Sequence, residues 1–299
     1  MSLAPIALFV YNRVEHTQKI IEALQLNDLS SRSNIIIFSD AAKDEKSIDK
    51  VLEVRKYVKS ITGFKSIQII ERQENLGLAE SIIDGVTAVV AKFGKVIVLE
   101  DDILTSPFFL TYMNNSLDLY QEEEAVVSIH AYNYPVQLDI TDDTFFLKGA
   151  DCWGWATWKR GWDLFESNGL HLLNQLKELG LEKDFNFNDT YPFTQMLKMQ
   201  IAKKNDSWAI RWYASAFLKN KLTLYPTKTL VYNIGLDNSG THSGKDIYFN
   251  ASNIDWEPLK ELKKLETKEN LAAKRSIEFF FRKHTKLSLK QRLKKLISF

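Results

Sequence analysis

Val96-Ile97-Val98-Leu99-Glu100-Asp101-Asp102-Ile103-Leu104 is the stretch that decides the fold. Its four leading apolar residues predict a buried strand, and this strand runs directly into three acids before the apolar sequence resumes. Packed carboxylates at such a place are costly unless a positive charge lies beside them. The carboxyl end of a strand in an open α/β sheet is also where ligands bind. Clustered oxygen ligands suit Mg²⁺ or Mn²⁺, so the stretch predicts a divalent cation that holds a diphosphate.

Apolar strands alternate with helical patterns upstream of this stretch. The predicted strands cover residues 6–11, 35–38, 67–70 and 96–99, and the predicted helices cover residues 15–24, 48–58 and 76–93. In the last of these helices the apolar residues recur at helical spacing. Strands separated by helices of this length imply a parallel sheet with right-handed crossovers.

The regular alternation weakens after Ile103. The pattern predicts a helix over 107–120 with proline in its first turn, a strand over 126–129, and a strand-and-turn region over 133–149. Further helices are predicted over 170–179, 191–203 and 210–219, followed by a loop over 235–244 and a helix-rich tail after Trp256. We therefore expect an α/β fold with a mostly parallel central sheet flanked by helices.

The last residues predict a basic amphipathic helix. From Ser288 onward, four apolar residues share one helical face and bases surround them: Leu289, Leu293, Leu296, Ile297, Lys290, Arg292, Lys294 and Lys295. Such a helix suits an anionic lipid surface, or it packs on the acidic body of the protein or on another subunit. We expect one domain over residues 1–248 and a helical tail over residues 249–299.

Composition narrows the class of protein. Hydrophobic residues make up 45% of the 299 residues, which is enough for a sizeable core. Seven of the 39 bases lie from Arg282 onward without an acid, so the rest of the chain is net acidic, which argues against nucleic-acid binding. The single cysteine excludes an intrachain disulfide. The sequence has no signal-like start and no apolar run near the ~20 residues of a membrane span, so we expect a cytoplasmic protein, or one peripheral to the inner face of the cell membrane.

The acidic stretch, followed by Ser106-Pro107-Phe108-Phe109, resembles the nucleotide-sugar glycosyltransferases of the GT-A fold. It is similar in particular to the N-acetylglucosaminyltransferase I branch and to related bacterial sugar transferases, over roughly residues 4–245. The resemblance implies a GT-A fold and a metal-dependent inverting transfer of a hexosyl or N-acetylhexosaminyl group in polysaccharide biosynthesis. It implies a nucleotide-diphospho-sugar donor, with a UDP-sugar favoured, and a glycan or lipid-linked acceptor.

The resemblance also assigns roles at the strand ends. In that family the last acid of the motif holds Mn²⁺, so Asp102 would ligate Mn²⁺ or Mg²⁺, while Asp101 would contact the nucleotide or sugar and Glu100 would lie near the sugar. The family's nucleotide-binding positions after strands one and two, and before the long helix, correspond to Asn12, Arg13, Asp40 and Asn75. Their structural alternatives are a surface arginine that caps a strand, a turn aspartate and a helix-capping asparagine.

A tryptophan-rich segment matches the family's stretch along the cleft between donor and acceptor. Flat aromatic faces suit sugar C–H surfaces, and glycine permits close backbone approach. We expect four residues at this sugar or acceptor cleft: Trp153, Gly154, Trp155 and Trp208. We expect Trp158 and Trp162 in the core, which is the alternative location for all of these tryptophans.

Two later positions complete the predicted site. Asp206 matches the family's catalytic base, which accepts the proton of the acceptor hydroxyl. Its structural alternative is a helix N-cap, and the acids that would replace it in the catalytic role are Asp151, Asp163 and Glu166. His242, flanked by Gly240 and Gly244, would ligate the metal or bind a phosphate, or it belongs to a polar loop. We expect His130 and His171 to be structural.

Two other functions remain as alternatives. One is a non-catalytic sugar-binding or scaffold member of a glycan-assembly complex, although the chain retains the acids expected of an enzyme. The other is a nucleotidyltransferase, but such enzymes usually carry a glycine-rich phosphate loop after strand one. Residues 12–17 contain no glycine. A haloacid-type phosphatase would need an aspartate pair at the same place, which is also absent from the sequence.

Overall fold

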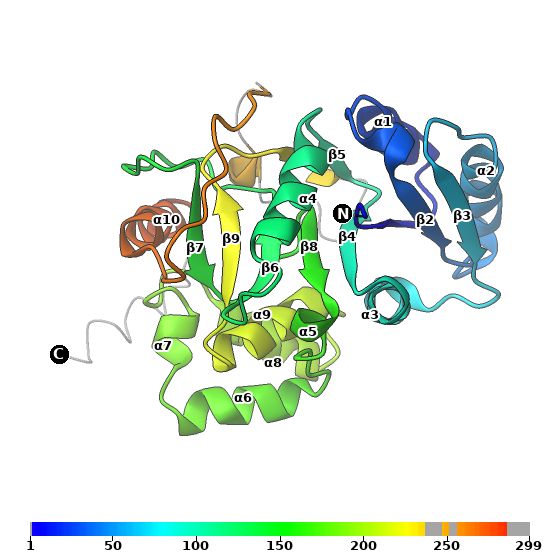
Figure 1. Cartoon of the computed structure of the whole chain (residues 1–299). Coiled ribbons are helices and arrows are strands. Elements are labelled where there is room, and N and C mark those ends of the chain that lie inside the picture. The colour runs from blue at the N-terminus through cyan, green and yellow to red at the C-terminus, as the bar shows by residue number, and fades with distance from the viewer. Residues whose placement is uncertain (1, 237–246, 251–255, 286–299) are drawn as a thin grey trace.

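The computed structural model describes residues 2–236, 247–250 and 256–285. Eight strands form its main sheet: β1 (Ile6–Val10), β2 (Asn34–Ser39), β3 (Ser66–Glu71), β4 (Lys95–Glu100), β6 (Val126–His130), β7 (Thr144–Lys148), β8 (Trp155–Trp158) and β9 (Leu222–Pro226). They are ordered β3-β2-β1-β4-β8-β6-β9-β7, so the N-terminal strands occupy one side of the sheet (Figure 1).

The main sheet is mixed. Strands β3, β2, β1 and β4 pair in parallel. Strand β8 is antiparallel to both β4 and β6, β6 is parallel to β9, and β7 is antiparallel to β9. The expected parallel pairing is therefore complete only across the N-terminal strands, because β8 enters the middle of the sheet in the opposite direction.

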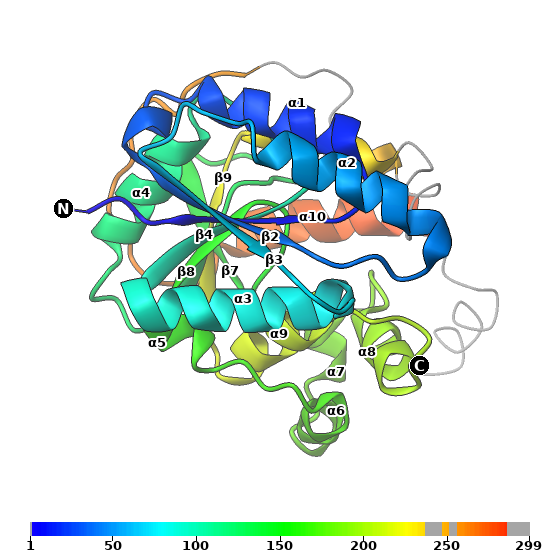
Figure 2. The ribbon, with the colours of Figure 1, turned by 90° about the vertical axis from the view of Figure 1, so that its right-hand side faces the viewer.

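Helices cover both faces of the sheet. On one face lie α1 (Val14–Gln25), α2 (Ile48–Val58) and α4 (Phe109–Leu119), and on the other lie α3 (Gly77–Phe93), α5 (Lys159–Trp162) and α9 (Trp208–Leu218) (Figure 2). Side chains alternate between the two faces along a strand. In β1, Ile6 and Leu8 accordingly belong to one hydrophobic core, whereas Ala7 and Phe9 belong to the other.

The remaining elements extend this framework. Helices α6 (Gly169–Glu178), α7 (Glu182–Phe185) and α8 (Phe193–Ile201) follow α5, and α10 (Leu271–His284) is the last described helix. Strands β5 (Ile103–Thr105) and β10 (Val231–Asn233) form a separate antiparallel pair. Four short 3₁₀ helices cover Ser30–Arg32, Glu45–Ser47, Ile234–Leu236 and Ile247–Phe249.

Helix α3 is held close to the sheet. A Cβ atom added at Gly85 would lie 2.7 Å from the ring of Phe9, so this position needs a glycine for the helix to pack against β1. The helix ends at Gly94, whose φ of 76° gives the left-handed C-cap that glycine adopts without strain. This packing fixes the N-terminus of α3 beside the carboxyl ends of β1 and β2.

Helix α10 belongs to the main body rather than to a separate tail. Its residues Ala273, Ile277, Phe280 and Phe281 are buried in the same hydrophobic core as α1 and α4. The first part of the predicted tail therefore packs on the domain that we expect over residues 1–248. The predicted basic helix after Ser288 lies outside the described residues. None of the described helices has the length and apolarity needed to cross a membrane.

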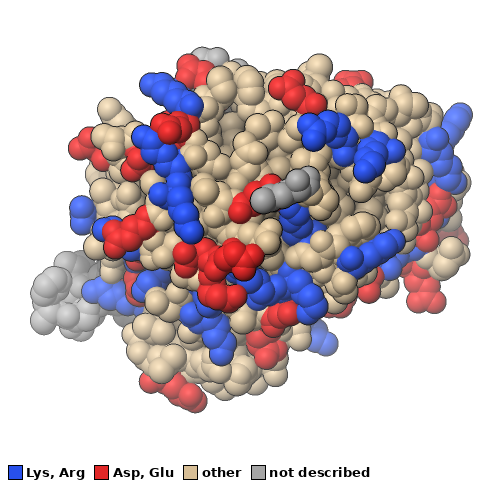
Figure 3. Space-filling model, in the orientation of Figure 1, with Lys and Arg blue, Asp and Glu red and all other residues tan. Residues whose placement is uncertain are grey.

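Charged side chains of both signs are interspersed on the face shown in Figure 3. This face lacks the continuous basic stripe that a nucleic-acid-binding surface presents. The mixed surface agrees with the near balance of 39 bases and 38 acids.

Candidate active site

The carboxyl ends of β1 to β4 lie at one edge of the sheet, because these strands are parallel. Arg13 follows β1, Asp40 follows β2, Arg72 follows β3 and Glu100 ends β4. This is the edge at which open α/β sheets bind ligands. The structure thus brings Arg13, Asp40 and the acidic stretch to one edge, as the sequence predicted.

Arg13 joins the two aspartates of the acidic stretch. Its Nη2 donates a hydrogen bond to Asp101 Oδ1 and another, of 3.0 Å, to Asp102 Oδ2. Although burial disfavours the charged guanidinium, the Asp101 and Asp102 carboxylates raise the pKa of Arg13 above its ordinary value. Arg13 therefore supplies the positive charge that the acidic strand end requires.

Burial also changes the protonation of the acids beside Arg13. Burial raises the pKa of Glu100 to about 8, with a further contribution from the charges of Asp102 and Asp101. Burial also raises the pKa of Asp101, although Arg13 opposes that shift. Asp101 Oδ2 is buried and has no hydrogen-bond partner among the described residues. Glu100 is therefore mostly protonated at neutral pH, and the cluster keeps an unused buried oxygen on Asp101.

These oxygens fit part of a ligand set for Mg²⁺ or Mn²⁺. Both ions accept carboxylate oxygens, and Mg²⁺ usually keeps several waters and binds substrate phosphates in addition to one or two carboxylates. No group of three or more potential metal ligands occurs among the described residues. The protein would therefore supply a partial ligand set, in which a cation competes with Arg13 for Asp101 and Asp102.

A late segment of the chain covers Asp102. The Ile234 N–H donates a 2.8 Å hydrogen bond to the Asp102 carbonyl oxygen. A Cβ atom added at the neighbouring Gly235 would lie 2.5 Å from Asp102 Oδ2. Gly235 is thus required for the 3₁₀ turn after β10 to approach the carboxylate, and the segment fixes one wall of the site.

Asp40 fastens the start of α3 to the end of β2. Its Oδ1 accepts hydrogen bonds from the backbone N–H groups of Ala41 (2.9 Å) and Leu76 (3.0 Å). Its Oδ2 accepts from Gly77 N–H (2.9 Å) and from Asn75 Nδ2 (3.1 Å). Because these four donors use the acceptor capacity of the carboxylate, Asp40 has a structural role here. Asn75 joins this network through its Nδ2 and does not cap α3, whose N-cap is Leu76 without a side-chain hydrogen bond.

Asp206 lies beside the N-terminus of α3. A Cβ atom added at Gly77 would be 3.8 Å from Asp206 Oδ2. The neighbouring residue Ser207, rather than Asp206, caps α9 through a hydrogen bond from Ile210 N–H. Asp206 is exposed, and no described residue donates a hydrogen bond to its carboxylate.

The three acids considered as substitutes for Asp206 are all engaged. Lys159 Nζ donates to both carboxylate oxygens of Asp163, at 2.8 and 2.7 Å. Glu166 Oε1 accepts a 2.6 Å hydrogen bond from Asn168 N–H. Asp151 Oδ1 accepts a 2.8 Å hydrogen bond from Cys152 N–H.

Asp151 also belongs to a second polar cluster that the sequence did not reveal. Its Oδ2 accepts hydrogen bonds from the hydroxyls of Tyr134 and Tyr225, each at 3.4 Å, and lies 3.9 Å from His130 Nδ1. His130 is fully buried, and its Nε2 accepts the Trp153 N–H, which places the proton of the neutral ring on Nδ1. Burial lowers the pKa of His130, although Asp151 opposes the shift.

Cys152 connects the two clusters. Burial raises the pKa of its thiol well above the ordinary value, with contributions from the charges of Asp151, Glu100 and Asp102. The charges of the acidic stretch and of Asp151 thus both act on this thiol. Tyr134 and Tyr225 were missed because the sequence pattern predicts no strand at β9 and only a broad strand-and-turn region around residue 134.

The tryptophan-rich segment is mostly core, which corrects part of the predicted cleft. Trp155 and Trp208 are 0% and 2% exposed and stack on each other with ring centroids 5.3 Å apart. Neither ring has a face available to a sugar, because both belong to the core between β8 and α9. Trp158 and Trp162 are buried, as predicted.

Trp153 and Gly154 lie where the chain enters β8. Trp153 is partly exposed, and its ring meets that of Tyr132 edge to face at 4.8 Å. Gly154 has a φ of 63°, and a Cβ atom there would lie 2.8 Å from Val231 Cγ1. The predicted contact with a sugar therefore remains open only for Trp153 and the backbone around it. His242 lies outside the described residues.

No protein-family model matches the chain, and no curated protein matches it. Among solved structures, it is similar to the mannosyltransferase PcManGT from Pyrobaculum calidifontis in complex with GDP-Man and Mn²⁺, at 13% identity and a TM-score of 0.34. That match covers 44% of this chain and 36% of the other.

A second similar structure is S. aureus TarS 1–349 in complex with UDP-GlcNAc, at 11% identity and a TM-score of 0.43. It covers 77% of this chain and 58% of the other. The chain thus spans less than two thirds of the length of the structures it matches. At these TM-scores and identities the similarity carries no argument about function, which has to come from the site.

Proposed function

We propose that the chain is a glycosyltransferase that binds a nucleotide-diphospho-sugar at the carboxyl ends of β1 to β4. The observation that carries the proposal is the cluster of Arg13 with Glu100, Asp101 and Asp102, which keeps an unused buried oxygen on Asp101. The resemblance of the acidic stretch to nucleotide-sugar transferases of the GT-A fold supports the same assignment.

In this proposal Asp102, with Asp101 beside it, holds Mn²⁺ or Mg²⁺. When bound, the cation would neutralise the charge that develops on the departing diphosphate. Arg13 would balance the remaining acids and contact the nucleotide-sugar, together with Asn12, Glu100 and Asp101. His242, from the segment that follows β10, is the further metal or phosphate ligand proposed from the sequence.

Asp206 is the proposed catalytic base of an inverting transfer. A general base needs a free lone pair within reach of the acceptor hydroxyl. Asp206 is the one of the four acids considered whose carboxylate accepts no hydrogen bond from the described residues. The acceptor would be a glycan or a lipid-linked sugar beside Trp153, and a UDP-sugar is the favoured donor.

Nucleotide binding tests this proposal directly. Addition of UDP with Mn²⁺ should raise the melting temperature, since a ligand at 100 times its Kd stabilises the folded state by about 2.7 kcal/mol. GDP and CMP, tested in the same way, identify the preferred nucleotide. A panel of nucleotide-sugars should then show metal-stimulated release of the free nucleotide.

Two alanine variants locate the site. Asp102→Ala should lose the metal-dependent rise in melting temperature and the turnover of nucleotide-sugar. Asp163→Ala, which removes an exposed aspartate paired with Lys159, should retain both. Parent-like protection of Asp102→Ala by UDP and Mn²⁺ would overturn the proposed site, and binding of a glycan without any nucleotide would favour a non-catalytic sugar-binding protein.

A further inference from the structure

One face of α10 is exposed, and that face is basic and partly apolar. Phe279 is 69% exposed and Leu271 is 57% exposed. Arg275, Arg282 and Lys283 are exposed at helical spacings from Phe279 and share its side of the helix. The opposite side of α10 is buried in the core.

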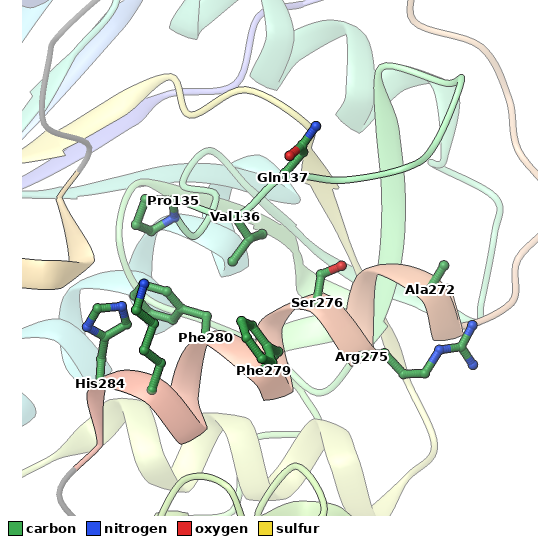
Figure 4. A pocket seen from close by; sticks show the side chains of 10 residues that line it. Pro135, Val136, Gln137, Ala272, Arg275, Ser276, Phe279, Phe280 and His284 are labelled. Carbon is green, nitrogen blue, oxygen red and sulfur yellow. The ribbon is translucent and has the colours of Figure 1, made fainter.

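A groove lies between α10 and residues 135–137, with a volume of about 490 Å³ (Figure 4). This volume lies within the range of pockets that hold small organic ligands. Val136, Phe279 and Phe280 line its apolar part. Cationic or titratable groups lie toward both ends of the groove. Arg275 lies near the start of α10, and Lys283 and His284 lie at its end.

Acidic groups do not neutralise this face. The lining of the groove contains no acid. Glu278 is the acid of α10, and its side chain is buried, where Asn188 Nδ2 donates to it at 2.6 Å and Arg282 lies 3.7 Å away. Among the described residues, neither Arg275 nor Lys283 forms an ion pair. Two cations therefore remain available beside an exposed aromatic ring.

The sequence beyond this helix has the same charge. Residues 285–299 contain five bases and no acid. A partner that covers the face of α10 must therefore accept positive charge and bury an aromatic ring. Anionic membrane surfaces attract clustered lysine and arginine, and aromatic rings are favoured at the boundary between headgroups and acyl chains.

We propose that the exposed face of α10 docks on an anionic phospholipid membrane. Arg275 and Lys283 contact lipid phosphates, and Phe279 enters the boundary between headgroups and acyl chains. This surface belongs to the described body of the protein and differs from the basic segment after Ser288 that the sequence singled out. The inference does not depend on the proposed glycosyl transfer.

Vesicle sedimentation with the full chain tests the proposal. The protein should bind vesicles of phosphatidylcholine with 30% phosphatidylglycerol and should not bind vesicles of phosphatidylcholine alone. Arg275→Gln with Lys283→Gln should weaken binding about 25-fold, since each base near an anionic surface contributes about fivefold. Phe279→Ser should also weaken it, and rising salt should weaken binding of the parent.

Matched variants on α2 provide the control. Lys50→Gln with Lys56→Gln removes two exposed bases, and Leu52→Ser removes an apolar side chain that is 55% exposed. Both should bind like the parent. All variants keep residues 286–299, so parent-like binding of the α10 variants would assign the binding to another segment and overturn the proposal. Equal losses in the α2 and α10 variants, or no binding of the parent, would also overturn it.

Discussion

Asp206 and Asp163 show how a carboxylate's surroundings decide its chemistry. Both are exposed aspartates, but Lys159 binds both oxygens of Asp163, whereas no described residue binds those of Asp206. An unbound carboxylate beside the proposed nucleotide-binding edge can accept a proton from an incoming hydroxyl. This difference is the residue-level basis for the proposed catalytic role.

Asp206→Asn should keep nucleotide binding and lose transfer. The amide retains the shape of the side chain but cannot take up the proton, so the rate should fall by about 10²–10⁴-fold. Release of UDP from the preferred UDP-sugar gives the rate, and the UDP-dependent melting shift gives the binding. Asp163→Asn is the control and should keep both. A parent-like rate in Asp206→Asn would show that another group is the base.

His130 should make the protein less stable in mild acid. Burial lowers its pKa below the ordinary value of 6.5, so the folded ring stays neutral where the unfolded chain binds a proton. The contribution of the neutral His130 ring to the free energy of unfolding is complete above pH 6.5. Below pH 6.5 this contribution declines by up to about 1.4 kcal/mol per pH unit, until the ring in the folded protein also binds a proton.

Urea unfolding at pH 7.5 and 5.5 measures this loss of stability. His130→Gln should reduce the difference in unfolding free energy between the two pH values, whereas His171→Gln, on the exposed side of α6, should leave it unchanged. NMR titration gives a separate readout in the parent. An imidazole of His130 that protonates at or above pH 6.5 would contradict the expectation.

At the scale of elements, the connection between β2 and α3 depends on one aspartate. Asp40→Ala would leave the N–H groups of Ala41, Leu76 and Gly77 without their acceptor. The loss should cost about 2–4 kcal/mol of unfolding free energy. Asp44→Ala, which removes the cap of a short exposed turn, should cost about 1 kcal/mol.

Urea denaturation measures both changes, and UDP binding distinguishes the two roles of Asp40. A variant that is destabilised but still binds UDP when folded confirms the structural role. If Asp40→Ala keeps its stability and loses UDP binding, Asp40 reads the nucleotide, as the resemblance implied.

The sequence predicted the first elements well because each had a clear pattern. The bounds of α2 match the prediction, and β1 to β4 and α3 differ from it by only one or two residues at their ends. Strand β8 was not predicted, because all four of its residues are buried and its sequence has no alternation of apolar and polar residues. Trp155 of this strand also matched a cleft motif, although it packs in the core.

The candidate site was predictable only in part, because some of its contacts depend on strands that the sequence pattern did not indicate. Arg13 and the acidic stretch follow predicted strands that share an edge, so their proximity could be expected. The contact of Gly235 with Asp102 and the bonds of Asp151 with Tyr134 and Tyr225 join distant segments through β9 and β10. Neither strand was predicted, so no local pattern indicated these contacts.

At the scale of the whole molecule, α10 is part of the core. Phe281 is 1% exposed and meets the rings of Tyr134 and Phe187 edge to face, at 5.1 and 5.4 Å. Phe281→Ala should therefore cost about 3–5 kcal/mol of unfolding free energy. Phe279→Ala, on the exposed side of the same helix, should change it by no more than about 0.5 kcal/mol.

Equilibrium urea unfolding compares the two variants. Helix α10 and the sheet should unfold in a single transition, followed by both far-UV circular dichroism and tryptophan fluorescence. Separate transitions in the parent, or equal effects of the two substitutions, would show that α10 does not unfold together with the sheet.

The contact between Gly235 and Asp102 has a consequence for synthesis on the ribosome. Asp102 leaves the exit tunnel more than a hundred residues before Gly235, which covers it in the folded protein. At ordinary elongation rates the emerging chain therefore carries its acidic stretch uncovered for several seconds. Arg13 is already outside by then and can neutralise part of the charge. The wall over Asp102 is added only after Gly235 has emerged, when all eight strands of the main sheet have already been synthesised.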